Sequence, residues 1–187
     1  MRSVCVFCGS SAGNRPDYLA TAREAGALIA RRNLTIVYGG GRVGLMGALA
    51  DAALAEGGRV IGVMPQMLID QEVGHAGLSQ LHVVASLSDR KVMMNELGDS
   101  FLALPGGIGT MDELFEAWTW TQLSLQQKPC GLLNQGGYYD ALIEFLDHAV
   151  AEGFLRPRHR AALLVASDVG SLLDRLTDAA TDRDGRP

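Results

Sequence analysis

The chain of 187 residues has few side chains that could hold a metal ion or form a redox disulfide. It contains three cysteines, an odd number, and four scattered histidines, without a His-Glu-x-x-His pattern or a second cysteine pair. Cys5 and Cys8 have Cys-x-x-Cys spacing, but their apolar surroundings indicate a strand, on which positions three apart point to opposite faces. We therefore expect buried, inert cysteines, and neither a metal nor another cofactor.

Positive charge and long apolar runs are also scarce. The formal net charge is −5, whereas a nucleic-acid-binding domain usually carries a basic face. Glycine or charge interrupts every apolar run before the roughly 18 residues that a membrane-spanning helix needs. The first residues, Met1 to Cys8, are typical of a strand rather than of a signal peptide. These features predict a cytoplasmic protein that binds neither nucleic acid nor a membrane.

Apolar runs alternate with segments of helical spacing along the chain. Strands are expected at Arg2 to Cys8, Leu34 to Tyr38, Arg59 to Met64, Leu81 to Ala85, Ser100 to Leu104, Cys130 to Leu133 and Ala162 to Val165. Helices are expected at Pro16 to Arg32, Gly44 to Glu56, Asp89 to Leu97, Thr110 to Leu123, Tyr138 to Glu152 and Val169 to Ala180. This order predicts an α/β fold, a Rossmann-like three-layer sandwich with a central, mainly parallel sheet and helices on both faces.

The length of the chain fits a single domain. We expect one nucleotide-binding domain over residues 1–180, followed by a polar tail over 181–187 that frays. The longest gap between expected elements runs from Pro65 to Ser79, and it could form a lid or a partner contact, or equally a plain surface connection.

Small residues follow three of the expected strands, at Cys8 to Ser11, Gly39 to Gly44 and Pro105 to Gly109. Ligands of open parallel sheets bind beyond the carboxyl ends of the strands. A helix start there offers unpaired N–H groups to an anion, and glycine lets the backbone approach it closely. The pattern predicts one phosphate held by converging loops.

Two familiar nucleotide motifs fit poorly. Gly39-x-Gly41-x-x-Gly44 matches the dinucleotide fingerprint, which needs a carboxylate after the next strand to bind a ribose hydroxyl. Here no carboxylate follows Met64 until Asp70. Neither the loop from Gly39 to Gly44 nor the loop from Pro105 to Gly109 has the Gly-Lys-Ser/Thr ending of a triphosphate-binding loop.

Two helix starts allow more than one interpretation. Thr110-Met-Asp-Glu113 fits a capping box, in which Glu113 only satisfies backbone groups. Capping does not explain the preceding Pro-Gly-Gly-x-Gly, however, so a functional carboxylate is the alternative. Ser88 and Asp89 fit an ordinary helix start, but Arg90 and Lys91 would oppose the helix dipole unless an anion lies nearby.

These motifs together resemble the LOG ("Lonely guy") family of cytokinin riboside 5′-monophosphate phosphoribohydrolases. The resemblance rests on Pro105-Gly-Gly-Ile-Gly-Thr-Met-Asp-Glu113, the upstream Arg90-Lys91, Tyr38 to Gly47 and Phe7 to Ser11, and it extends to about Leu176. It implies a Rossmann-like homodimer that releases the free base and ribose 5-phosphate from an N6-substituted adenosine monophosphate.

By position, the resemblance implies that Arg90 and Glu113 are catalytic. It also implies substrate contacts from Glu72, Arg90, Lys91, Gly107, Ile108, Gly109, Thr110, Met111, Asp112, Glu113 and Thr119. Such sequences have also been labelled lysine decarboxylases, but no lysine here lies in an evident pyridoxal phosphate motif. The segment Gln122-Leu-Ser-Leu-Gln126 departs from the family pattern, which leaves the substrate preference open.

A fixed carboxylate can stabilise the positive charge that develops on ribose during glycosidic cleavage, or can orient water. We assign this role to Glu113, with Glu116 as the less favoured substitute. Arg90 could serve the leaving base or the phosphate, which would lie on the N–H groups of Gly107, Gly109 and Thr110. The alternatives are a non-catalytic nucleotide sensor and a phosphoribohydrolase of another base specificity.

Overall fold

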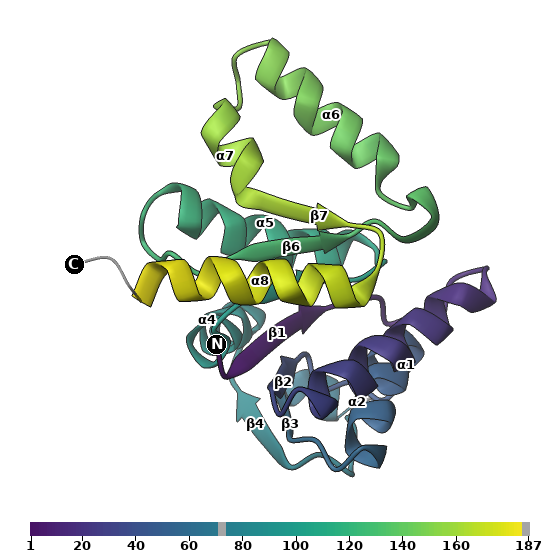
Figure 1. The fold of residues 1–187 in the computed structure, drawn as a ribbon. Helices are drawn as coiled ribbons and strands as arrows, with labels where there is room; N and C mark the ends of the chain where they lie inside the picture. The colour runs from purple at the N-terminus through teal and green to yellow at the C-terminus, as the bar shows by residue number, and fades with distance from the viewer. Residues whose placement is uncertain (71–73, 185–187) are drawn as a thin grey trace.

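A seven-stranded sheet forms the centre of the molecule (Figure 1). The structure is a computed structural model, and it describes residues 1–70 and 74–184. The strands are β1 (Ser3–Phe7), β2 (Thr35–Tyr38), β3 (Val60–Pro65), β4 (Gln80–Val84), β5 (Phe101–Ala103), β6 (Cys130–Leu133) and β7 (Leu163–Ala166), in the spatial order β4-β3-β2-β1-β5-β6-β7. Each neighbouring pair is parallel. The predicted Rossmann-like fold is therefore confirmed, and in the described part of the chain the sheet is parallel throughout.

Helices cover the sheet and connect its strands. They are α1 (Pro16–Arg31), α2 (Gly44–Ala55), α3 (Gln66–Ile69), α4 (Leu87–Leu97), α5 (Ile108–Gln122), the 3-10 helix η1 (Gln135–Gly137), α6 (Asp140–Ala151), α7 (Pro157–Ala162) and α8 (Val169–Asp184). The six helices expected from the sequence are present. The short α3, η1 and α7 were missed, because they are too short for an apolar period to emerge. The helix expected to end at Ala180 continues to Asp184, so the first part of the expected frayed tail is helical.

Each face of the sheet has its own apolar core, because successive strand residues point to opposite faces. Val4 and Val6 pack with α1, α2 and α8, whereas Cys5 and Phe7 pack with α4 and α5. Cys5 and Cys8 belong to different cores, and both are buried and free of disulfides. Burial raises the pKa of each thiol, which keeps it neutral. The expectation that the Cys-x-x-Cys spacing holds buried cysteines is confirmed.

The strand order changes direction at β1, with β2 on one side of it and β5 on the other. The loops after these strands meet at the carboxyl edge of the sheet. The Gly9 N–H donates to the Pro105 carbonyl at 3.1 Å, and the Leu45 N–H donates to the Gly9 carbonyl at 3.0 Å. Gly44 has a φ of +60°, and a Cβ there would lie 2.3 Å from the backbone of Ser10. The three glycine-rich loops therefore converge, at the place where open parallel sheets bind ligands.

Candidate active site

The glycine-rich loop after β5 leads directly into α5. This helix begins at Ile108 with Gly107 as its N-cap, so Thr110 is the third helical residue rather than the cap. Thr110 is buried, and a Cβ on Gly106 would lie 2.1 Å from its hydroxyl oxygen. The capping-box interpretation of Thr110 and Glu113 is wrong, because Gly107 caps the helix and Thr110 lies inside its first turn. The absence of a side chain at Gly106 leaves room for the buried Thr110.

The start of α5 presents backbone donors to open space. The first helical bond runs from the Met111 N–H to the Gly107 carbonyl, and the N–H groups before it have no partner within the helix. A Cβ on Gly107 or Gly109 would meet nothing within 4 Å. This end of α5 is therefore open to an anion, as its sequence predicts.

Two neighbouring tyrosines that the sequence analysis did not single out support this loop. The Tyr138 hydroxyl donates to the Gly106 carbonyl, and the Tyr139 hydroxyl donates to the Leu104 carbonyl, each at 2.7 Å. They follow β6 and η1, about 30 residues after the loop, and only the fold brings them to it. Their position after Gly136-Gly137, at a further strand end, is the one signal in the sequence that points to them.

Arg90 comes from α4, which begins two residues earlier than predicted. Ser86 is the cap, accepting from the Asp89 N–H at 3.0 Å, so the expectation that Ser88 caps this helix is wrong. The guanidinium of Arg90 then reaches across the carboxyl edge of the sheet. Its Nε donates to the Val63 carbonyl at 3.1 Å, and its Nη2 lies 3.1 Å from Glu113 Oε1. The structure therefore brings together the two residues for which the resemblance implies a catalytic role.

The ion pair between Arg90 and Glu113 is largely removed from solvent. Their side chains are 15% and 11% exposed. Burial raises the pKa of Glu113 above the usual range of a carboxyl group, and the charge of Arg90 opposes this shift. Burial favours the neutral form of this carboxyl group and Arg90 favours the charged form, so the group is suited to gain or lose a proton during a reaction.

Arg90 and Glu113 line a cavity of about 500 Å³, a volume within the range of small-molecule sites. The polar part of its lining contains Arg90, Glu113 and the start of α5. Val43, Met46, Met64 and Leu68 form the apolar part, called here the apolar wall. The lining residues are Cys8, Gly9, Ser10, Gly39, Gly41, Val43, Met46, Met64, Leu68, Arg90, Gly107, Ile108, Gly109, Thr110 and Glu113. The described residues contain no group of three or more histidine, cysteine, aspartate or glutamate side chains placed to hold a metal ion.

Some residues expected to contact substrate lie outside this cavity. Lys91, Met111, Asp112 and Thr119 are not among its lining residues, and Thr119 is exposed further along α5. Glu72 lies outside the described residues. The substrate contacts implied for these five positions stay predictions.

The Arg90 side chain can reach Glu113 past Gly39 only because glycine has no side chain. A Cβ there would lie 1.8 Å from Arg90 Nη2. We expect Gly39→Ala to fold normally, because the flexible guanidinium can move, but to lose the contact between Arg90 and Glu113 and with it about tenfold or more in kcat/KM. Circular dichroism would check the fold, and steady-state turnover of the nucleotide that the family resemblance implies would check kcat/KM. Gly170→Ala is the matched control, since a Cβ there meets atoms no closer than 3.4 Å, and equal turnover in both variants would contradict the prediction.

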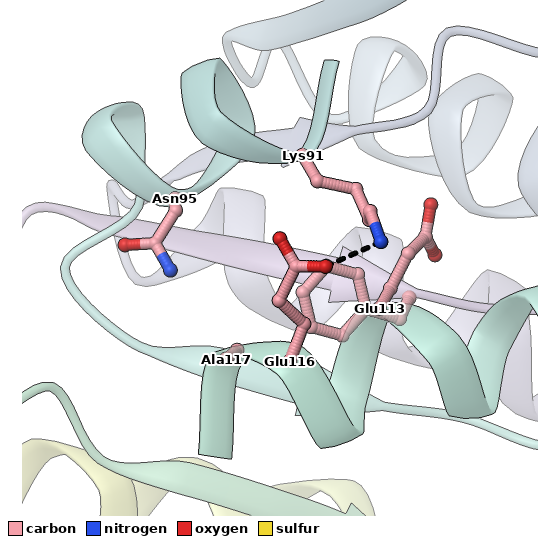
Figure 2. Close-up of a pocket in the computed structure, with 6 residues that line it drawn as sticks. Lys91, Asn95, Glu113, Glu116 and Ala117 are labelled. Atoms are coloured by element: carbon pink, nitrogen blue, oxygen red, sulfur yellow. Dashed lines mark ion pairs between the residues drawn. The ribbon is translucent and has the colours of Figure 1, made fainter. Parts of the chain in front are cut away.

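Beside Glu113, a smaller chamber lies between α4 and α5 (Figure 2). Lys91 and Asn95 enter it from α4, and Glu113, Glu116 and Ala117 from α5. Lys91 forms ion pairs with Glu116 and, at 3.1 Å, with Asp112. Glu116, considered above as a substitute for Glu113, is thus engaged with a lysine and does not line the larger cavity.

The chain is similar to named enzymes over most of its length. The chain is 49% identical to a cytokinin riboside 5′-monophosphate phosphoribohydrolase of Rhodococcoides fascians, over 90% of this chain and 85% of that protein. An Arabidopsis thaliana enzyme of the same name is 44% identical, over 95% and 83%. The chain belongs to the LOG family. The family model described as "Possible lysine decarboxylase" matches residues 46–176.

Solved structures support the fold of this LOG family member. A molybdenum cofactor binding protein from Rippkaea orientalis aligns with a TM-score of 0.71 at 20% identity, covering 95% of this chain and 97% of that one. The molybdenum cofactor carrier protein of Chlamydomonas reinhardtii aligns with a TM-score of 0.68, also at 20% identity, covering 97% and 99%. At this identity the likeness shows a shared architecture.

The description of the family model as a possible lysine decarboxylase does not fit the lysines of this chain. A pyridoxal phosphate enzyme needs a lysine to hold its cofactor as a Schiff base. The sequence has two lysines, Lys91 and Lys128. Neither lines the larger cavity, and the Lys128 ammonium donates to the backbone carbonyl of Asn95.

Proposed function

We propose that the protein hydrolyses the N-glycosidic bond of N6-substituted adenosine 5′-monophosphates, and also that of AMP, to give the free base and ribose 5-phosphate. The observation that carries this proposal is the buried pair of Arg90 and Glu113, which lines the same cavity as the open start of α5. The names of the relatives at 44–49% identity support the same reaction.

The start of α5 is the proposed phosphate site. The N–H groups of Gly107, Ile108, Gly109 and Thr110 lie before or at the first turn of the helix, whose dipole favours a negative charge. Phosphate binding there would anchor the ribose over Glu113, one turn further along the same helix. Interactions far from the reacting bond then serve catalysis by fixing its position.

In the proposed reaction, water adds to C1′ of the ribose as the bond from C1′ to the base nitrogen breaks. The oxygen of water becomes the new ribose hydroxyl, one proton of water passes to the departing base, and no oxidant or reductant is required. Glu113 stabilises the positive charge on the ribose and orients the water. Arg90 donates hydrogen bonds to the leaving base or to the phosphate.

The apolar wall is the proposed site of the base. Val43, Met46, Met64 and Leu68 line the same cavity as the charged pair. Thioether and aliphatic side chains suit a flat base, and methionine adapts readily to different apolar groups. This wall supports an adenine that carries an apolar N6 substituent.

The decisive experiment is to incubate the protein with AMP and with isopentenyladenosine monophosphate, and to follow the free base by chromatography. We expect equal amounts of base and ribose 5-phosphate from each substrate. Isopentenyladenosine, which lacks the phosphate, is the matched control and should be cleaved far more slowly. Nucleotide binding without release of base would instead indicate a sensor protein, and would refute the proposed activity.

We also propose that the protein is a homodimer, as the family resemblance implies. Apolar side chains exposed on α4 and just after α5 support a contact with a second copy: Leu87, Val92, Leu123 and Leu125. Analytical ultracentrifugation should give twice the 19.9 kDa mass of one chain, and a monomer at micromolar concentration would contradict this. The expected cytoplasmic location stays a prediction.

A further inference from the structure

Tyr138 holds one peptide unit of the glycine-rich loop before α5. Its hydroxyl donates to the Gly106 carbonyl at 2.7 Å, a contact between positions 32 residues apart. Tyr138, Gly106 and Gly107 help to line a second cavity of about 240 Å³. Of these three residues, only Gly107 also lines the larger cavity that contains Arg90 and Glu113. The peptide unit between the two glycines therefore lies at the boundary between the two cavities.

The ring of Tyr138 is fixed by two other rings. It packs edge to face against Tyr139, with ring centroids 4.7 Å apart, and against Tyr18 of α1, with centroids 5.5 Å apart. Aromatic pairs favour this geometry. Tyr138 is 40% exposed, yet these contacts restrict its side chain, so the fold determines where its hydroxyl lies.

A peptide unit between two glycines needs such a contact to keep one orientation. Glycine adopts positive and negative φ about equally readily, so the unit between Gly106 and Gly107 could rotate at little steric cost. In a planar trans peptide the C=O and N–H bonds point in opposite directions. The hydrogen bond from Tyr138 to the carbonyl therefore also directs the Gly107 N–H, which points away from the tyrosine.

We propose that Tyr138 is a positioning residue for the substrate phosphate: by holding the Gly106 carbonyl, it keeps the Gly107 N–H directed into the larger cavity. Gly107 is the N-cap of α5, so its N–H adds to the donors of the first helical turn. A rotated peptide unit would present its carbonyl oxygen there instead, and this oxygen would repel a phosphate. The inference rests on the proposed function, since it assumes the phosphate site at the start of α5.

Tyr139 makes a bond of equal length without the same consequence. Its hydroxyl donates to the Leu104 carbonyl at 2.7 Å, but the next residue is Pro105, whose nitrogen carries no hydrogen. The peptide unit that Tyr139 holds therefore has no donor to offer a ligand. Tyr139 is buried, so removal of its hydroxyl takes a hydrogen bond from the interior at a cost in stability. The two tyrosines thus separate the direction of a donor from support of the fold.

The test is Tyr138→Phe, which keeps the ring and removes only the hydroxyl. Affinity for ribose 5-phosphate, measured by calorimetry, should fall about tenfold, the order expected for one hydrogen bond to a charged group. Affinity for adenine, which has no phosphate, should stay within about twofold. The preference in kcat/KM for isopentenyladenosine monophosphate over isopentenyladenosine should fall by the same factor as the affinity for ribose 5-phosphate. A general loosening of the fold would not discriminate between ligands in this way.

Tyr18→Phe is the matched control, since it removes a hydroxyl from the same group of rings and keeps the ring that packs against Tyr138. It should bind ribose 5-phosphate as wild type does. Tyr139→Phe should lower the melting temperature more than Tyr138→Phe does, and the affinity for ribose 5-phosphate less. Unchanged affinity in Tyr138→Phe, or an equal fall for adenine and ribose 5-phosphate, would overturn the inference while leaving the proposed function intact. A wild-type protein that releases no base would refute both.

Discussion

Glu113→Gln is expected to lower kcat by about 10²–10⁴-fold, the usual range for loss of a group that stabilises charge or moves a proton in the transition state. Glutamine has nearly the same shape, so the packing around the 11% exposed side chain should survive. It is neutral, however, and can neither stabilise a positive ribose nor accept a proton from water. KM should change little, because the phosphate site at the start of α5 is untouched.

Single-turnover kinetics with isopentenyladenosine monophosphate, together with calorimetric binding of the same nucleotide, would separate the loss of chemistry from a loss of binding. Glu144→Gln, an exposed glutamate of α6, is the matched control and should behave as wild type. If Glu113 served only the packing of α5, the glutamine variant would be silent, because glutamine has nearly the same shape. Turnover within twofold of wild type would therefore remove Glu113 from the proposed mechanism.

The order of strands and helices was predictable because it depends on local patterns. Buried parallel strands are short apolar runs, and the connecting helices carry an apolar period. All seven expected strands are present. The two helix starts of the site were misplaced by two residues. Before α4 two serines could act as the cap, and before α5 a glycine takes the place expected for a polar cap. Ser86 caps α4 instead of Ser88, and Gly107 replaces Thr110 at α5.

The convergence of the three glycine-rich loops was predictable for a different reason. Parallel strands carry their carboxyl ends to one edge, so small residues after several strands meet without any knowledge of packing. Contacts between distant parts of the chain could not be predicted from the sequence. The bond from Arg90 to the Val63 carbonyl, the clearance at Gly39, and Tyr138 on the Gly106 carbonyl each depend on how the elements pack.

Arg90→Ala is expected to weaken both binding and turnover, with a fall in kcat/KM of about 10²–10³-fold. Alanine removes the donor that faces the substrate. It also leaves Glu113 without the cation that lies 3.1 Å away. Arg90→Lys should recover little of the loss, because a single ammonium does not reproduce the guanidinium fork that bonds the Val63 carbonyl with Nε and Glu113 with Nη2.

The pH profile of Arg90→Ala shows whether the loss of the substrate-facing donor or the loss of the cation beside Glu113 dominates. Removing Arg90 takes away the charge that lowers the pKa of Glu113, whereas burial, which raises that pKa, remains. The carboxyl group then stays protonated to a higher pH, so the acid limb of kcat/KM should move upward while the turnover above it stays reduced. Arg160→Ala is the matched control, as Arg160 is also little exposed and paired with one carboxylate. An unmoved limb with normal KM would remove Arg90 from the proposed mechanism, and the buried pair would no longer carry the proposed function.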